Sequence, residues 1–153
     1  MTVLEPGSPA PEFSLADEQG GRFTRADLLG HTTVLVFYPF AFSSVCSEQL
    51  TLYEEVLGEL DARGARILAV SCDASPSQTA FRERLRVSIG QLSDFEPKGE
   101  VCRAFGVLHD GGFPERALVI VGPDGVVSWS YQAGSPGELP GANLIFDGLA
   151  AAL

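Results

Sequence analysis

The chain has 153 residues, of which 45% are hydrophobic and 20% are charged. This length fits one domain, and the share of apolar side chains excludes a disordered chain. The formal net charge is −10, which argues against nucleic acid and anionic membrane surfaces as partners, because both attract basic faces. We therefore expect one globular domain over residues 1–153.

The first residues give no sign of export or membrane insertion. Residues 1–6 lack a basic segment followed by an apolar one, so no signal peptide is expected. The longest apolar stretch, residues 34–42, contains Pro39 and falls well short of the ~20 residues that a membrane span needs. These features predict a soluble, cytoplasmic protein.

The first half of the chain predicts a strand–helix–strand unit. Residues 33–37 and 66–72 are short β-branched apolar runs, typical of strands buried on both faces of a parallel sheet. Between them, residues 44–62 predict a helix with Gly64 as its stop. The apolar side chains of this helix recur on one face: Leu50, Tyr53, Val56, Leu57 and Leu60. Such a unit is right-handed.

A second helix is expected to begin at Ser75, the predicted N-cap, with Pro76 as its first helical residue. It would direct Phe81 and Leu85 toward the core. This helix lengthens the alternation of strands and helices that is typical of a parallel sheet.

The last third of the chain predicts a hairpin and a closing helix. Strands at residues 117–121 and 126–131 flank the turn sequence Gly-Pro-Asp-Gly at 122–125, so they should pair antiparallel. Residues 143–153 can form a helix. Parallel strand–helix units followed by a hairpin and a helix indicate an α/β protein with a thioredoxin-like fold, a central mixed β-sheet flanked by helices.

The three cysteines are Cys46, Cys72 and Cys102. An odd number in a chain of this length argues against a purely structural disulfide framework, so at least one thiol must be free. The three lie far apart in sequence without a C-x-x-C pair, and no metal site is predicted.

Cys46 falls two or three positions into the predicted helix after the first long strand. There the free N–H groups of the first turn and the helix dipole stabilise a thiolate relative to a thiol. The dipole contributes at most about 2 kcal/mol, so a cation should assist. The alternative is structural: free cysteine is often buried, and Cys46 would then be a small apolar residue at a helix start.

The segment before Cys46 ends a strand, turns and enters the helix. Ser43 or Ser44 is expected to be the helix N-cap, and Ser43 could also direct its hydroxyl to a ligand bound over Cys46. Pro39 prevents a normal continuation of the strand and presents an apolar ring.

Pro39, Ser43 and Cys46 are spaced as P-x-x-x-S-x-x-C. With this spacing the sequence resembles the peroxiredoxins, whose active-site pattern is P-x-x-x-T/S-x-x-C. The likeness continues in family order along the chain, through the following segments: G-x-x-A-P-x-F-x-L at 7–15, Leu92-Ser93-Asp94, Phe105-Gly106-Val107, Arg116 before a strand, and Pro123-Asp124-Gly125. The stretch FYPFAFSSVC at 37–46 is most similar to the one-cysteine alkyl hydroperoxide reductase E group.

The resemblance implies a thiol-dependent peroxidase that reduces hydrogen peroxide and organic hydroperoxides without a cofactor. It implies that Cys46 is the peroxidatic cysteine, that Ser43 binds the peroxide oxygen, and that Pro39 shields the thiolate from water. Arg116 would complete the pocket. Threonine is commoner than serine in the family at position 43, so the freer hydroxyl affects the expected rate but not the reaction.

From residue types alone, we would expect Arg116 to form a surface ion pair with Glu115 or another carboxylate. The resemblance to the peroxiredoxins instead implies that Arg116 lies in the pocket around Cys46. Gln49 lies three residues past Cys46, where the family often has Glu or Gln that orients the arginine. His31 and His109 have no recognisable spacing to Cys46, so both are expected in surface loops.

Attack on a peroxide leaves a sulfenic acid that a thiol must resolve. Cys72 ends a predicted core strand and is expected to be buried and inert. Cys102, in a predicted helix at 99–105, is the better internal candidate, while Thr51 occupies a position where one subfamily carries the resolving cysteine. We expect an external reductant: a low-molecular-weight thiol such as mycothiol, or a glutaredoxin-like or thioredoxin-like protein.

Several alternatives differ in function class. A disulfide reductase needs a second thiol near Cys46, and a cysteine phosphatase needs an arginine within residues 47–53; both are missing. A thioredoxin-like peroxide sensor, a non-catalytic binding module and a two-cysteine enzyme using Cys102 remain open. The resemblance also implies a homodimer, and Phe40 and Phe42 could face solvent or the neighbouring subunit.

Overall fold

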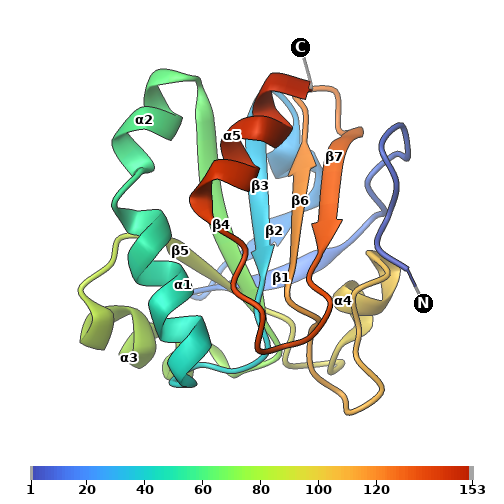
Figure 1. Cartoon of the computed structure of the whole chain (residues 1–153). Helices are drawn as coiled ribbons and strands as arrows, with labels where there is room; N and C mark the ends of the chain where they lie inside the picture. Colours follow the sequence, from blue (N-terminus) through green and yellow to red (C-terminus); the bar gives the residue numbers. More distant parts are fainter. Residues whose placement is uncertain (1, 152–153) are drawn as a thin grey trace.

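A seven-stranded mixed sheet with strand order β2-β1-β5-β4-β3-β6-β7 forms the centre of the computed structural model (Figure 1). The structure describes residues 2–151. The strands are β1 (Ser14–Asp17), β2 (Arg22–Thr24), β3 (Thr32–Phe37), β4 (Ala65–Ser71), β5 (Gly90–Ser93), β6 (Ala117–Val121) and β7 (Val127–Gln132). The helices are the 3-10 helix η1 (Arg25–Leu28), α1 (Ser44–Glu54), α2 (Leu57–Ala62), α3 (Ser75–Leu85), α4 (Glu100–Ala104) and α5 (Ala142–Ala151).

Strands β3, β4 and β5 run parallel, with α1, α2 and α3 in the connections. Strand β6 pairs antiparallel with β3, and β7 pairs antiparallel with β6. The predicted strand–helix–strand unit, the hairpin and the α/β class are therefore confirmed. The closing helix is also present, although residues 152–153 of its predicted range lie outside the described residues.

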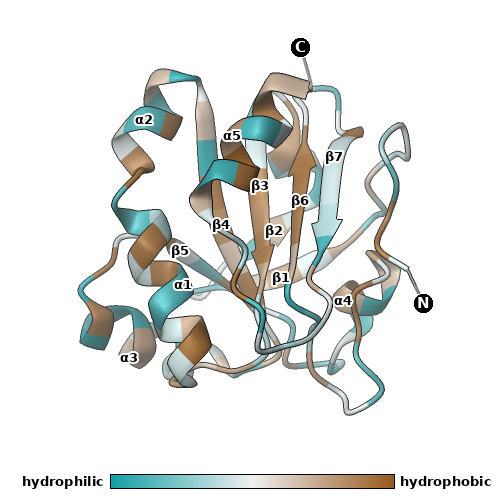
Figure 2. Cartoon of the chain, viewed as in Figure 1, coloured by the Kyte–Doolittle hydropathy of each residue, from teal (hydrophilic) through white to brown (hydrophobic). Residues whose placement is uncertain are grey.

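The central strands are buried on both faces, as their apolar runs predict. In β3, Val34 and Val36 belong to one core cluster and Leu35 and Phe37 to the other, because successive side chains of a strand point to opposite faces. The first cluster lies under α1, α2, α3 and α5, and the second under α4 and the N-terminal segment. Figure 2 shows the hydrophobic colour concentrated on β3 and β6, with β7 paler at the sheet edge.

The predicted helix at 44–62 is in fact two helices, α1 and α2. At the end of α1, Glu55 and Val56 donate their backbone N–H groups to the carbonyls three residues earlier. The side chain of Glu54 accepts hydrogen bonds from the backbone and hydroxyl of Ser88, just before β5. This long-range contact has no signature in local periodicity, and Leu50 and Leu60 remain fully buried on either side of the break.

The N-cap of α3 is Ala74 and not Ser75. The carbonyl of Ala74 accepts the first helical bonds, from Ser77 and Gln78, so Ser75 is already the first helical residue. Pro76 is therefore the second helical residue and not the first as predicted, and Phe81 is fully buried.

Three short strands were not predicted from the sequence: the hairpin of β1 and β2, and β5. Each has only three or four residues, which is too short for a clear alternation of apolar and polar positions.

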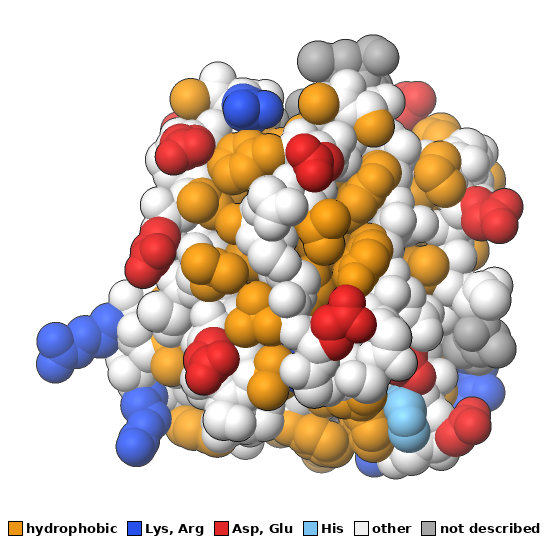
Figure 3. Space-filling view, viewed as in Figure 1, with side chains coloured by type: hydrophobic (Ala, Val, Ile, Leu, Met, Phe, Trp, Pro, Cys, Tyr) orange, Lys and Arg blue, Asp and Glu red, His pale blue; other side chains and the backbone are white. Residues whose placement is uncertain are grey.

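Among residues 2–151, no helix combines the length and the apolar character that crossing a bilayer demands. Acidic side chains are spread between hydrophobic ones over the face of α1, α2 and α5 (Figure 3).

Candidate active site

The site forms where β3 ends, α1 begins and the chain enters β6. Phe37, the last residue of β3, pairs with Ala117, the first residue of β6. Because these strands are antiparallel, the residue before β6, Arg116, lies beside the loop that follows β3. The sheet register thus joins two segments that are about 70 residues apart in sequence.

Cys46 occupies the third position of α1, and its side chain is 0% exposed. Ser43 is the N-cap, and its hydroxyl oxygen accepts a hydrogen bond of 3.3 Å from the backbone N–H of Cys46. Of the two serines considered as caps, Ser43 is therefore the correct one, and Ser44 is the first helical residue. The sulfur lies in the first helical turn, where free N–H groups favour negative charge.

The loop between β3 and α1 is held in an unusual backbone conformation. Phe42 has a positive φ of 69°, a conformation that only Phe42 and Arg86 adopt among the non-glycine residues described. Such a conformation costs about 1–3 kcal/mol and persists only when the surroundings impose it. Here the ring of Phe42 packs 5.3 Å from that of Phe81, and the carboxylate of Asp73 accepts a 2.8 Å hydrogen bond from the N–H of Ala41. Both contacts fix the entry into α1.

Arg116 is 2% exposed and points into the site. Its Nη2 donates to the Cys46 sulfur at 3.3 Å, its Nη1 donates to Oε1 of Gln49 at 2.6 Å, and its Nε donates to the carbonyl of Pro136 at 2.8 Å. The structure places Arg116 beside the Cys46 sulfur, as the family pattern implies, and not in a surface pair with Glu115. Gln49 lies beside it as expected.

No carboxylate among residues 2–151 pairs with the charge of Arg116. Arg116 is buried, and the acceptors from Gln49 and Pro136 are neutral. The one salt bridge within residues 2–151 joins Arg82 and Glu18. A buried guanidinium without an anion is energetically costly, so Arg116 is placed to stabilise negative charge that arises at or beside the Cys46 sulfur.

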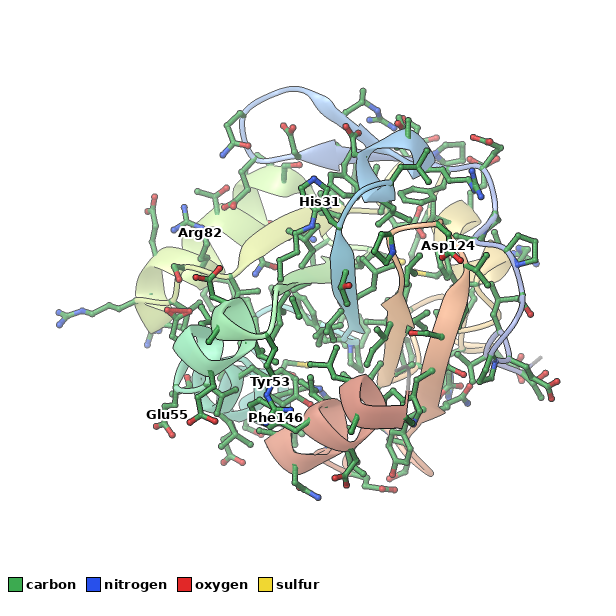
Figure 4. All side chains as sticks on the ribbon, turned by 90° about the horizontal axis from the view of Figure 1, so that it is seen from above. His31, Tyr53, Glu55, Arg82, Asp124 and Phe146 are labelled. Carbon is green, nitrogen blue, oxygen red and sulfur yellow. The ribbon has the colours of Figure 1, made fainter. Side chains whose placement is uncertain are left out.

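Gln49 is itself held by a buried tyrosine. Its Nε2 donates to the hydroxyl of Tyr53 at 3.1 Å, and Tyr53 donates to the carbonyl of Pro140 at 2.7 Å. Burial raises the pKa of Tyr53 to about 12, which keeps the hydroxyl protonated as this chain of donors requires. Figure 4 shows Tyr53 on the side of α1 that faces α5. Sequence reasoning assigned Tyr53 only to the apolar helix face and missed its hydrogen-bonding role.

Gln49→Leu removes the acceptor that holds the guanidinium of Arg116 in position but leaves Arg116 itself in the site. We expect Gln49→Leu to lower the second-order rate constant with hydrogen peroxide about 10-fold, since one charged hydrogen bond of roughly 1.5–3 kcal/mol is lost. Tyr53→Phe should have a smaller effect on rate and should lower the free energy of unfolding by about 1–2 kcal/mol, because it leaves the Pro140 carbonyl unpaired. Stopped-flow kinetics and urea denaturation measure the two effects. Equal rates in wild type and Gln49→Leu would contradict this role.

Aromatic residues line the outer side of the loop. Pro39 is buried, whereas Phe40 is half-exposed and packs 4.9 Å from the ring of Phe113. His109 stacks on Phe113 at 4.3 Å and is only partly exposed. The structure confirms a surface loop for the exposed His31 (Figure 4) and for the partly exposed His109, which in addition packs in this aromatic group.

The other two cysteines lie away from Cys46. Cys72 and Cys102 are buried in the core cluster on the opposite face of the sheet from Cys46. Cys72 is buried as predicted, but the structure does not bring Cys102 to Cys46. Instead, Cys72, Cys102 and Asp94 place their sulfur and oxygen atoms within 4.8 Å of one another. Cysteine spacing alone could not show this group, because it joins three separate elements.

The comparison with known families decides the identity. A sequence model of the AhpC/TSA family matches residues 6–130. The chain belongs to this family. The match spans the loop, Cys46, Gln49 and Arg116, and it confirms the resemblance to peroxiredoxins.

Relatives and solved structures of this family cover nearly the whole chain. Alkyl hydroperoxide reductase E of Mycobacterium tuberculosis H37Rv is 30% identical over 151 residues, which is 97% of this chain and 98% of the relative. Peroxiredoxin Bcp of Escherichia coli K12 is 28% identical over 139 residues, covering 91% and 85%. The crystal structure of Enterococcus faecalis AhpC has a TM-score of 0.88 and 26% identity, covering 99% and 93% of the two chains. The thioredoxin-like fold is thereby confirmed.

Membership in this family makes the chain a peroxiredoxin, an enzyme with thiol-dependent peroxidase activity. The geometry agrees with that chemistry. A thiolate attacks a peroxide O–O bond much faster when donors are held ready for the charge that moves to the leaving oxygen, and Arg116 and Ser43 both lie next to the Cys46 sulfur or its backbone.

Proposed function

We propose that the chain reduces hydrogen peroxide and organic hydroperoxides by a one-cysteine cycle, in which Cys46 becomes a sulfenic acid and an external thiol restores it. The observation that carries the proposal is the 3.3 Å contact between the buried guanidinium of Arg116 and the Cys46 sulfur. The name of the M. tuberculosis relative, alkyl hydroperoxide reductase E, supports alkyl hydroperoxides as substrates.

In the first step, the Cys46 thiolate attacks one peroxide oxygen in line with the O–O bond. That bond breaks, its electron pair moves to the distal oxygen, and a proton from solvent converts this oxygen into water or an alcohol. The sulfur is oxidised to sulfenic acid while the peroxide is reduced. Arg116 and Ser43 supply N–H and O–H donors for the two oxygens, and Pro39 keeps bulk water from the thiolate.

In the second step, an external thiol condenses with the sulfenic acid and releases water, leaving a mixed disulfide. A second thiol then attacks this disulfide and frees Cys46. The separation of Cys46 from Cys72 and Cys102 by the sheet supports an external partner over an internal one. Candidate reductants are low-molecular-weight thiols such as mycothiol and glutaredoxin-like or thioredoxin-like proteins.

Mass spectrometry after one equivalent of peroxide tests this cycle. We expect a sulfenic acid on Cys46 that dimedone traps and that an added thiol reduces, followed by sustained turnover. A disulfide between Cys46 and Cys72 or Cys102 would instead indicate a two-cysteine cycle. Trapping without turnover with any thiol would favour a peroxide sensor.

Replacing Ser43 tests the hydroxyl beside the sulfur. Ser43→Ala should lower the peroxide rate constant about 5- to 10-fold, since one neutral hydrogen bond is lost, and should cost about 1 kcal/mol of stability through loss of the N-cap. Ser43→Thr keeps both functions and is the matched control. Stopped-flow rates and denaturation midpoints separate the catalytic effect from the capping effect. A Ser43→Ala enzyme with the wild-type rate would show that the hydroxyl does not bind peroxide.

We further propose a homodimer that works in the cytoplasm. Phe40 and Phe42 are about half exposed beside the site, and such aromatic side chains are enriched at protein interfaces. A cytoplasmic location suits the cycle because thiols are kept reduced there. Light scattering after size exclusion measures the oligomeric state, and a monomer at micromolar concentration would contradict the dimer.

A further inference from the structure

Cys72, Asp94 and Cys102 form a buried cluster that the peroxidase cycle does not use. Cys72 follows β4, Asp94 follows β5, and Cys102 lies in α4. Their donor atoms lie within 4.8 Å of one another. The cluster belongs to the core on the face of the sheet opposite Cys46.

Asp94 fixes the two thiols in this arrangement. Its Oδ2 accepts a 2.8 Å hydrogen bond from the backbone N–H of Cys102, and its Oδ1 accepts one of 3.2 Å from Val101. Strand β5 pairs with β4, and the N–H of Asp94 donates to the carbonyl of Ser71, next to Cys72, at 2.8 Å. One residue therefore ties the start of α4 to the end of β4 and holds both sulfurs close together.

We propose that Cys72 and Cys102 are a second redox centre, a dithiol that small disulfides oxidise to an intramolecular disulfide and that small thiols reduce again. The two sulfur atoms lie within 4.8 Å of each other. To form a disulfide they must move to the S–S bond length of about 2.05 Å. Rotation of either cysteine between staggered χ1 positions changes the separation on this scale. The two oxygens of Asp94 already accept backbone N–H groups, which favours a thiol pair over a metal site.

The oxidation proceeds by two exchange steps. The Cys72 thiolate attacks one sulfur of a disulfide RSSR, the S–S bond breaks, and RS⁻ leaves and takes up a proton. The Cys102 sulfur then loses its proton and attacks the Cys72 sulfur of the mixed disulfide, releasing the second RSH. In sum, two protein thiols and RSSR become one protein disulfide and two RSH.

The structure also sets the order of attack. Cys72 is 8% exposed, whereas Cys102 is 0% exposed, so an external disulfide reaches Cys72 first. The hydrogen bond with Cys102 lowers the pKa of the Cys72 thiol, with a further lowering by Lys98. The same hydrogen bond and burial raise the pKa of Cys102. Cys72 is thus the nucleophile, and Cys102 completes the bond.

The test uses the full chain with Cys46→Ser, which removes the peroxidatic thiol and makes the result independent of peroxidase activity. After incubation with glutathione disulfide, the mass of the protein should fall by that of two hydrogen atoms. Neither Cys72 nor Cys102 should then react with an alkylating agent. Trypsin should then release peptides 67–82 and 99–103 as one joined species that dithiothreitol separates. Because the disulfide closes a loop of about 30 residues, the melting temperature should rise by roughly 5–10 °C.

Two further variants in the same background test the order. With Cys102→Ala, Cys72 should stop at a mixed disulfide that carries one glutathione. With Cys72→Ala, Cys102 should stay unmodified in the folded protein. The proposal is overturned if both thiols remain alkylatable after treatment, if Cys72 keeps glutathione while Cys102 is present, or if thiol reactivity disappears without a joined peptide pair, as a bound metal ion would cause.

Discussion

Replacing Cys46 with serine should lower the rate of peroxide reduction at least about 1,000-fold, because a serine hydroxyl stays protonated at neutral pH and is a far weaker nucleophile than a thiolate. The serine keeps nearly the same volume in a position that is 0% exposed, so the fold should be retained. Stopped-flow mixing with hydrogen peroxide and with an alkyl hydroperoxide measures the loss. Circular dichroism confirms that the variant is folded.

The other two cysteines provide matched controls for this result. Cys72→Ala and Cys102→Ala remove thiols that lie on the opposite face of the sheet, so both variants should consume peroxide at rates close to wild type. If either of them loses peroxidase activity as fully as Cys46→Ser, Cys46 is not the only essential thiol and the one-cysteine cycle is wrong.

The part of the site that depends on local structure could be predicted from the sequence. A strand, a turn and a helix that begins near Ser43 put Cys46 in the first helical turn, and the structure confirms this position and the cap. Local hydrogen bonds decide these features, and the residues that make them are neighbours in the chain. The exact N-cap of α3 was wrong, at Ser75 instead of Ala74, because helix boundaries depend on carbonyl geometry that residue types do not specify.

The position of Arg116 depends on sheet register and not on local sequence. From composition alone a surface pair with Glu115 was the simpler interpretation, and only the family resemblance favoured the pocket. The pairing of Phe37 with Ala117 provides the physical reason. A shift of this register by one residue would reverse which side chains face the core, and no short-range signal in the sequence sets it.

The backbone carbonyls that hold Tyr53 and Arg116 in the site could not be predicted for a related reason. Tyr53 meets the Pro140 carbonyl, and Arg116 meets that of Pro136; both acceptors are backbone atoms of the segment between β7 and α5. Backbone carbonyls are present in every residue, so residue type does not identify those that bind. The cluster of Cys72, Asp94 and Cys102 could not be predicted either, because it forms only when β4, β5 and α4 are packed together.

Replacing Arg116 with methionine should lower the second-order rate constant for hydrogen peroxide about 100- to 1,000-fold, the usual effect of removing a preorganised donor from a charged transition state. Methionine fills similar space without charge, so the Cys46 sulfur loses both its counter-charge and its 3.3 Å donor. Arg116→Lys should recover part of the rate, since it restores the charge without the fork of donors. Glu115→Gln is the matched control and should leave the rate unchanged.

A double-mutant cycle with Gln49 separates direct from indirect action. If Gln49 acts only by holding Arg116 through the 2.6 Å hydrogen bond, Gln49→Leu should lower the rate in wild type and change it little in Arg116→Met, because residues that act as a unit are non-additive. Full additivity would mean that Gln49 contacts the reacting atoms itself. Wild-type activity in Arg116→Met would mean that the helix terminus and Ser43 alone keep the sulfur reactive, contrary to the charge balance of the buried site.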